Sequence, residues 1–170
     1  MKTKKKAEGG ATPCLECGGA LRTAQRPYRY RFEGGLSVTL ENATVMTCVA
    51  CGAESVAIHA PARLHRAVAE AVVRKASRLA ASEVAFLRHH LDMTGEQMAR
   101  HLGVSKTSVS RWETGREPIG QVPDRLLRTL VLLQDWQARP DLELFARLGP
   151  AARPSHIKVT LQGEDWNAAA

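Results

Sequence analysis

Hydrophobic positions in the first third of the chain alternate with polar ones, and this period of two predicts β-strands. Residues 28–32 alternate aromatic side chains with arginines, and residues 36–40 alternate apolar with polar side chains. Between them, Glu33-Gly34-Gly35 predicts a hairpin turn. Two shorter apolar runs can add further strands: residues 45–47 and 56–58. We therefore expect residues 12–60 to form a small β-rich domain.

From Pro61 onward the apolar spacing changes to the three- and four-residue steps of an amphipathic helix. Residues 62–79 keep this spacing, and we assign residues 61–81 to a helical linker. Residues 82–136 show several short helical patterns and predict an all-α domain. The signals that divide it are Ser82 as a cap, Thr94 and Gln97 as a capping box, Gly103 as a left-handed end, Ser105 as a cap and Pro123 in a first turn.

The two ends of the chain have weaker patterns. Residues 1–11 are rich in lysine and glycine and predict a flexible basic tail. Residues 137–170 form a C-terminal extension whose structure the pattern does not define: residues 141–148 suggest a short helix, residues 157–161 suggest a strand, and we expect the last residues to be loose. The predicted fold class is α+β, with a small β-rich four-cysteine module joined by a helical linker to an all-α domain.

Four cysteines form two CxxC pairs, Cys14 with Cys17 and Cys48 with Cys51, separated by residues 18–47. A CxxC turn places two thiolates on one side of a tight loop, and glycines directly follow both pairs. Two such turns supply four soft ligands to one tetrahedral Zn²⁺ ion and leave no open position for water. The sequence therefore predicts one structural zinc ion held by these four cysteines.

Two other uses of the cysteines stay open at this point, namely redox chemistry by a CxxC pair and an iron–sulfur cluster or another metal. A redox CxxC usually stands alone in a βαβ setting, which this chain does not show. Because four thiolates already saturate zinc, the histidines are interpreted as surface or core residues. Since zinc binding and folding are coupled, we expect loss of a zinc ligand to unfold residues 12–60.

Residues 93–115 have the features of a helix-turn-helix. Ala99 is small enough for two helices to approach closely, Gly103 makes the turn, and Val104 and Val109 lie between the helices. Trp112 is predicted to anchor the second helix in the core. The side chains left facing outward are Lys106, Thr107, Ser108, Ser110 and Arg111.

A helix with such an outer face suits the major groove of double-stranded DNA. Arg111 can donate two hydrogen bonds to a guanine edge, and Lys106 and Thr107 can reach base edges or phosphates. Ser108 and Ser110 are expected at phosphates, which position a protein without reading sequence. An αα-hairpin with no DNA role is the alternative interpretation of the same segment.

The formal net charge of +7 favours a polyanionic partner. Residues 82–136 nevertheless balance acidic and basic side chains, and the positive excess lies in residues 1–31 and 61–81. We therefore expect the linker to help grip the DNA backbone, and a merely solvated basic face is the alternative. The basic residues of the linker are Arg63, Arg66, Arg74, Lys75 and Arg78.

Several classes of protein lack support in the sequence. No apolar stretch follows the basic N-terminus, and no run of about 18 apolar residues occurs, so we expect no secretory signal, no membrane span and a cytoplasmic location. No carboxylate pair, no nucleophile with a base and no open metal site is recognisable, so we do not expect an enzyme.

Residues 94–116 resemble the Cro/repressor-type (XRE-like) helix-turn-helix in the Gly-Val-Ser turn and the Trp-Glu-Thr-Gly ending. The order of CxxC, spacer, CxxC-Gly, linker and helix-turn-helix over residues 12–136 is similar to the MqsA (YgiT-type zinc finger) antitoxin family. The resemblance implies that the four cysteines hold zinc and that Thr107 and Arg111 read bases. It also implies an N-terminal domain that binds a toxin and a C-terminal domain that dimerises on its own operator.

The sequence thus predicts a homodimeric, sequence-specific DNA-binding transcriptional regulator, acting as a repressor, with a structural zinc module. The expected dimer surface is the apolar last helix, through Leu126, Leu130 and Leu133. The alternative is a type II antitoxin that neutralises a toxin protein through its zinc domain and regulates its own operon.

Overall fold

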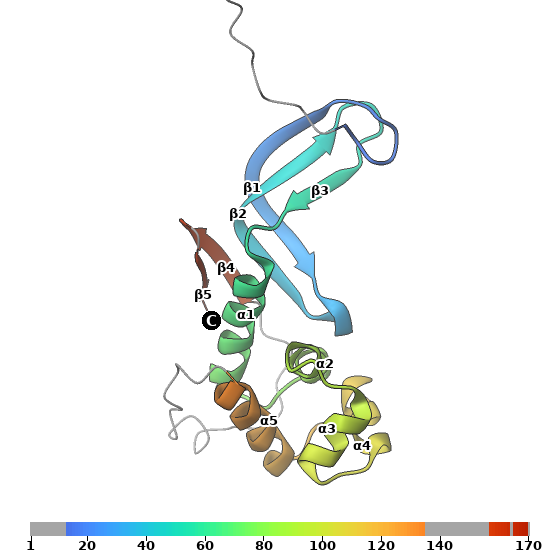
Figure 1. Cartoon of the computed structure of the whole chain (residues 1–170), viewed down its shortest axis with the longest axis vertical. Helices are drawn as coiled ribbons and strands as arrows, with labels where there is room; N and C mark the ends of the chain where they lie inside the picture. The colour runs from blue at the N-terminus through green and yellow to red at the C-terminus, as the bar shows by residue number, and fades with distance from the viewer. Residues whose placement is uncertain (1–12, 135–156, 164, 170) are drawn as a thin grey trace, which may run out of the picture.

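A computed structural model describes residues 13–134, 157–163 and 165–169, and it has the predicted α+β fold (Figure 1). A β-sheet that carries the four cysteines lies at one end of the molecule, and a group of helices lies at the other. In chain order the elements are β1 (Leu21–Arg31), the 3-10 turn η1 (Glu33–Gly35), β2 (Ser37–Cys48), β3 (Glu54–Ala57), α1 (Pro61–Arg74), α2 (Ala81–His90), α3 (Gly95–Leu102), α4 (Lys106–Glu113), α5 (Gln121–Gln134), β4 (Ile157–Gln162) and β5 (Asp165–Ala169).

The sheet is built on a long antiparallel hairpin of β1 and β2, and the predicted turn at residues 33–35 joins them. β2 is one strand through residues 37–48, whereas the sequence suggested separate strands at 36–40 and 45–47. Asn42 takes a φ of 56°, a left-handed conformation that asparagine tolerates. The strand is therefore irregular at this residue but continues to pair on both sides of it. Opposite it, the register of β1 shifts between Arg26 and Tyr28.

This irregularity divides the sheet into two parts with different neighbours. Nearer the helices, residues 38–41 of β2 pair with β4, and we call this part the inner sheet. Farther out, residues 44–47 of β2 pair with β3, and we call this part the outer sheet. The cysteine loops lie at the far end of the outer sheet (Figure 1).

The C-terminal hairpin completes the inner sheet. The strand expected at residues 157–161 is confirmed as β4, but the expectation that the last residues are loose is wrong for residues 165–169, which form β5. Burial explains the difference, because Ile157, Val159 and Trp166 all enter the core. The Trp166 Nε1–H also donates a hydrogen bond of 2.7 Å to the His59 carbonyl. The helix suggested at residues 141–148 lies outside the described residues.

The turn η1 docks the sheet directly onto α2. A Cβ atom added at Gly34 would lie 2.6 Å from the Cβ of Ala85, and Gly34 also takes a φ of 81°, so glycine is required at this contact. Beside it, the Phe32 ring packs edge-on against His65 of α1 and Phe86 of α2, with centroid distances of 4.8 and 4.9 Å. The sheet, the linker helix and the helical domain therefore share one core.

Helix α1 ends at Arg74, earlier than the apolar spacing to residue 79 predicts. The buried Arg128 of α5 donates hydrogen bonds to the carbonyls of Val73, Lys75 and Ser77, and so holds residues 75–79 in a loop against α5.

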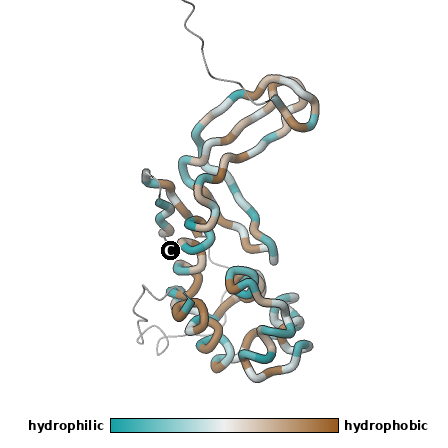
Figure 2. The backbone as a smooth tube through the Cα atoms, viewed as in Figure 1, coloured by the Kyte–Doolittle hydropathy of each residue, from teal (hydrophilic) through white to brown (hydrophobic). Residues whose placement is uncertain are grey.

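Helix α2 starts at Ala81, and the Glu83 carboxylate caps it by accepting from the Ala80 N–H, instead of the predicted Ser82. Figure 2 shows hydrophobic stretches along α5 and hydrophilic stretches along α3 and α4.

Candidate metal centre and nucleic-acid interface

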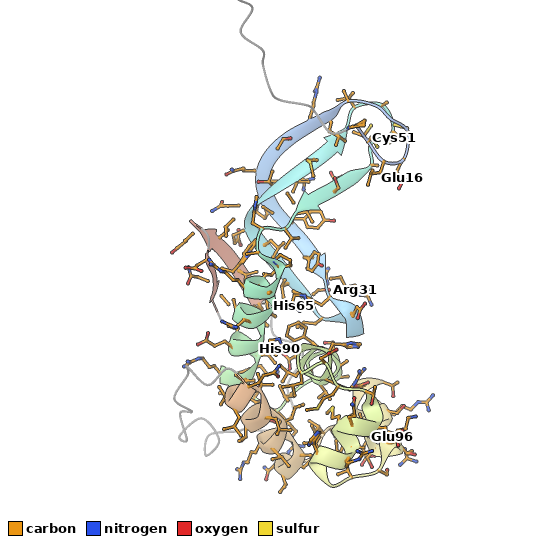
Figure 3. The ribbon with its side chains drawn as sticks, viewed as in Figure 1. Glu16, Arg31, Cys51, His65, His90 and Glu96 are labelled. Atoms are coloured by element: carbon orange, nitrogen blue, oxygen red, sulfur yellow. The ribbon has the colours of Figure 1, made fainter. Side chains whose placement is uncertain are left out.

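The two CxxC segments form two loops with the same backbone hydrogen bonds. The Cys14 N–H donates to the Gly19 carbonyl and the Gly18 N–H to the Cys14 carbonyl. In the second loop the Cys48 N–H donates to the Ala53 carbonyl and the Gly52 N–H to the Cys48 carbonyl. Each loop thus turns its two sulfurs toward the other loop, and Cys51 is labelled at this end of the molecule in Figure 3.

Three glycines allow the loops to close. Gly18 and Gly52 take φ values of 72° and 74°, which favour glycine. Gly19 is favoured for a different reason, since a Cβ there would lie 3.1 Å from the Cys48 Sγ atom and 3.0 Å from the Ala50 Cβ atom, closer than ordinary contact. The absence of a side chain at Gly19 therefore lets the second loop approach the first.

The four sulfur atoms have the geometry of a tetrahedral thiolate site. All four lie within 4.8 Å of one another. Cys14 Sγ is 3.7 Å from Cys51 Sγ, and Cys17 Sγ is 3.5 Å from Cys48 Sγ. A tetrahedron with zinc–sulfur bonds of about 2.3 Å has edges of about 3.8 Å. The predicted ligands are thus brought together at spacings that fit one Zn²⁺ ion.

The electrostatics of this site also favour a bound cation. Backbone N–H groups of Cys51 and Ala50 lower the pKa of Cys48 to about 6, so one thiolate forms readily. The Ala53 N–H lowers the pKa of Cys51, but hydrogen bonds with Cys17 and Cys48 outweigh it and raise this pKa to about 12. Four neighbouring sulfurs therefore ionise together only when a bound metal offsets their charge. With four protein ligands, such a metal is structural.

The helix-turn-helix consists of α3 and α4, and the predicted local signals are confirmed. Thr94 caps α3, with its Oγ1 accepting from the Gln97 N–H while the Gln97 side chain accepts from the Thr94 N–H. Gly103 ends α3 at a φ of 67°. The Ser105 hydroxyl caps α4 by accepting from the Ser108 N–H. Val109 and Trp112 are buried and attach α4 to the core.

Four of the five side chains predicted to meet DNA share an exposed face of α4. They are Lys106, Thr107, Ser110 and Arg111. Ser108 differs, because it is half-buried and its hydroxyl lies 2.9 Å from that of Ser105. The Arg111 guanidinium is 3.8 Å from the exposed Glu117 carboxylate, a weak contact that leaves it able to reach a ligand.

A pair of residues that the sequence analysis missed fixes the orientation of α4. Arg88 of α2 donates hydrogen bonds of 2.6 and 3.2 Å to the two carboxylate oxygens of Glu113. The same guanidinium donates to the carbonyl of Met93, which lies between α2 and α3. Such a bidentate, mostly buried pair restrains both helices. No local sequence pattern marks it, because its partners are 25 residues apart.

In the described part of the helical domain, exposed cations outnumber exposed anions. Among residues 82–134, the acidic side chains of Glu83 and Asp124 are fully buried. The charged residues of this span that remain exposed are Arg100, Lys106, Arg111, Arg116 and Arg125 against Asp92, Glu96 and Glu117. Cations therefore predominate at its surface, and Glu96 is labelled on α3 in Figure 3.

The linker offers fewer cations than expected. Lys75 forms an almost completely buried ion pair with Glu83, so it is not available to grip a DNA backbone. Arg63 is paired with Asp165 at 2.8 Å and Arg74 with Glu70 at 2.8 Å, although both arginines stay about half exposed. The expectation of a basic DNA-gripping linker is therefore wrong for Lys75.

The fold and the site together define a chain with a helix-turn-helix domain and a sheet whose four cysteines are placed to hold a metal ion. Residues 80–135 match a family described as a helix-turn-helix domain. A search of curated proteins found no match to the chain. Within the described ranges, each helix is too short or too polar to cross a bilayer.

Proposed function

We propose that this protein is a sequence-specific DNA-binding transcriptional regulator, acting as a cytoplasmic repressor, whose zinc module is structural rather than catalytic. The observation that carries the proposal is the exposed face of α4, formed by Lys106, Thr107, Ser110 and Arg111 on a helix anchored by Val109 and Trp112. A repressor built in this way covers its operator and keeps other proteins off it.

The geometry supports a division of labour along α4. Arg111, more than half exposed in the last turn of α4, suits two hydrogen bonds to the O6 and N7 atoms of a guanine. Lys106 and Thr107 lie in the first turn, where the positive end of the helix dipole adds attraction for phosphate. The Arg88–Glu113 pair holds the helix rigid, so that binding costs little conformational entropy.

Replacing Arg111 with alanine tests this interface. We expect Arg111→Ala to weaken binding to the chain's own promoter by about 1–3 kcal/mol and to relax preference at one base pair. The matched control is Arg116→Ala, which removes the same charge from an exposed position beyond α4. It is expected to weaken all sequences equally. Binding measured against a library of operator variants separates the two effects, and unchanged preference in Arg111→Ala excludes Arg111 as a reader.

Helix α5 is the proposed dimer surface. An apolar stripe along this helix includes the predicted residues and one more: Val122 and Leu133 are exposed, and Leu126 and Leu130 are half-buried against the core. Val122 is 75% exposed and Leu133 is 50% exposed, a large apolar exposure for a regular helix. A two-fold dimer through this stripe would present two α4 helices to half-sites about one DNA turn apart.

A charge on this stripe is expected to separate the dimer. Leu133→Glu places two carboxylates in one apolar contact, so we expect its dimer dissociation constant to rise by roughly tenfold or more. Gln134→Glu adds the same charge at the next exposed position and serves as the control. Sedimentation over a range of concentrations measures both. A wild-type chain that stays monomeric, both free and on DNA, contradicts the dimer.

A second candidate function is an antitoxin that binds a toxin through the zinc module. The observation that favours it is the exposure of Leu15 (96%) and Val49 (55%) at the tips of the two cysteine loops, far from α4. Apolar side chains in that position suit a protein partner better than DNA. A neighbouring gene for a small toxin-like ribonuclease, together with co-purification of its product, would favour this function over a regulator that acts alone.

A further inference from the structure

Two arginines on the β1–β2 hairpin are not used by the proposed function. Arg29 and Arg31 alternate along β1 with two tyrosines that pack against the core, so the arginines lie together on the opposite face of the sheet. Both are exposed, and residues two apart on one strand lie about 6–7 Å from each other. Their cross-strand neighbours on β2 are Thr39 and Ser37, so β2 adds no charge beside them.

The two arginines have no acidic partner within the described ranges of the chain. The carboxylates that follow them most closely in the sequence have other neighbours. Glu33 lies 3.5 Å from His89, and Glu41 lies 3.4 Å from Lys158. Two exposed guanidinium groups are therefore available to an anion from outside the chain, at the end of the hairpin that meets the helices.

Helix α2 places this end of the hairpin beside α4. Gly34 of η1 packs directly on Ala85 of α2. A Cβ atom at Gly115, two residues after α4, would lie 3.7 Å from the Cβ atom of Ala81. Ala81 and Ala85 are four residues apart, so they lie on one face of α2. In Figure 1 the end of the hairpin lies beside α2, on the same side of the molecule as α4.

The hairpin is fixed to the helical domain, so its arginines keep a set position relative to α4. Phe32, which follows Arg31, packs against Phe86 of α2 with a centroid distance of 4.9 Å. Gly34 leaves no room for a side chain against Ala85. When α4 enters the major groove, this end of the sheet is therefore brought close to the same duplex.

We propose that Arg29 and Arg31 bind phosphates of the DNA backbone beside the groove that α4 enters, an inference that rests on the proposed function. Guanidinium groups form paired hydrogen bonds with phosphate oxygens, and each such contact releases counterions from the DNA. Phosphate contacts carry no sequence information, so the hairpin contributes affinity and orientation while α4 reads bases. The proposal also gives a role to part of the positive excess in residues 1–31.

The test measures binding of the zinc-loaded full chain to a duplex of its own promoter at several salt concentrations. Each lost phosphate contact lowers the magnitude of the slope of log affinity against log salt by about 0.9. The double variant Arg29→Gln with Arg31→Gln is therefore expected to lower it by roughly two, and by the same amount on a duplex of random sequence. Arg111→Ala differs, because it changes the preference among operator sequences.

Arg22→Gln is the matched control for Arg31→Gln. Arg22 is an exposed arginine of the same strand, but it lies at the end near the cysteine loops, opposite Thr47 of β2. Its replacement should leave the salt slope unchanged, whereas Arg31→Gln alone should lower it by about one. Hydroxyl-radical footprints should show that the double variant loses backbone protection at one side of each half-site and keeps the protection around α4. Circular dichroism and zinc content verify folding.

The proposal is overturned if the double variant keeps the wild-type salt slope, or if Arg22→Gln lowers the slope as much as Arg31→Gln does. Its failure is distinguishable from failure of the proposed function. A wild-type chain that binds its promoter and loses sequence preference in Arg111→Ala, yet is unaffected by the double variant, contradicts only the hairpin contact. A wild-type chain that binds no duplex at low salt contradicts the proposed regulator itself.

Discussion

Cys48→Ser is expected to unfold the outer sheet while the inner sheet and the helical domain stay folded. The outer sheet has little apolar core of its own, since its fully buried side chains are few: Cys14, Ala43, Val45 and Cys48. Units of this size seldom fold without a metal or a disulfide. Structural zinc supplies about 10–16 kcal/mol in zinc-finger peptides at pH 7, so losing one ligand removes the main source of stability there.

The inner sheet is stabilised differently. Phe32, Leu36, Val38 and Leu40 are buried in a core shared with α1, and β4 pairs with β2 alongside them. We therefore narrow the expected unfolding from residues 12–60 to the outer sheet and its cysteine loops. Amide hydrogen exchange read by mass spectrometry distinguishes the two outcomes, because it reports each segment separately.

Val49→Ser is the control for this experiment. Val49 lies between two zinc ligands, is 55% exposed, and offers no ligand atom, so its replacement should leave exchange unchanged. Removal of zinc from the wild-type chain by a chelator should reproduce the Cys48→Ser pattern. Protection of residues 44–57 that survives both treatments would show that zinc does not stabilise the outer sheet.

Arg128→Met is expected to destabilise the helical domain by about 3–5 kcal/mol, the usual cost of breaking a buried ion pair by removing one partner. The Arg128 guanidinium is fully buried and donates to Asp124 at 2.6 Å as well as to three carbonyls of the 73–77 segment. Methionine fills much of the volume but leaves the Asp124 carboxylate with only the Leu79 N–H, 2.8 Å away. Urea unfolding of the zinc-loaded chain measures the change in free energy.

Arg125→Met provides the matched control for Arg128→Met. Arg125 is an exposed arginine of the same helix, so its replacement should change stability by less than about 0.5 kcal/mol. Adding Asp124→Leu to Arg128→Met should recover part of the loss, because no buried charge is then left unpaired. Equal effects of the two arginine variants would mean that the buried pair contributes nothing to stability.

What the sequence predicts well is local. Each CxxC pair, the α3 capping box and the Gly103 turn depend on residues within five positions of one another, so their spacing alone reveals them. The pairing of strands that lie far apart in the sequence cannot be predicted from local spacing. Nothing in residues 157–161 tells that β4 pairs in parallel with β2, more than a hundred positions earlier, or that β5 closes over α1.

The burial of charged side chains is the second feature of the fold that the sequence does not reveal. An arginine or lysine in a helical pattern is normally assigned to the surface, because these side chains are rarely buried unless paired. Lys75 and Arg128 are exceptions, and each is buried because it pairs with a carboxylate. Lys75 pairs with Glu83 of α2, and Arg128 pairs with Asp124, four residues earlier in α5. The shortened α1 and the overestimated basic linker both follow from these two pairs.

Because β4 joins β2, the helical domain is inserted within the sequence of the sheet domain. During synthesis the ribosome releases β1, β2 and β3 before helices α1 to α5, and β4 and β5 after these helices. The helix-turn-helix can fold before β4 is available to pair with residues 38–41 of β2. A chain stopped before residue 157 would leave the backbone of this edge unpaired, so we expect it to be prone to self-association.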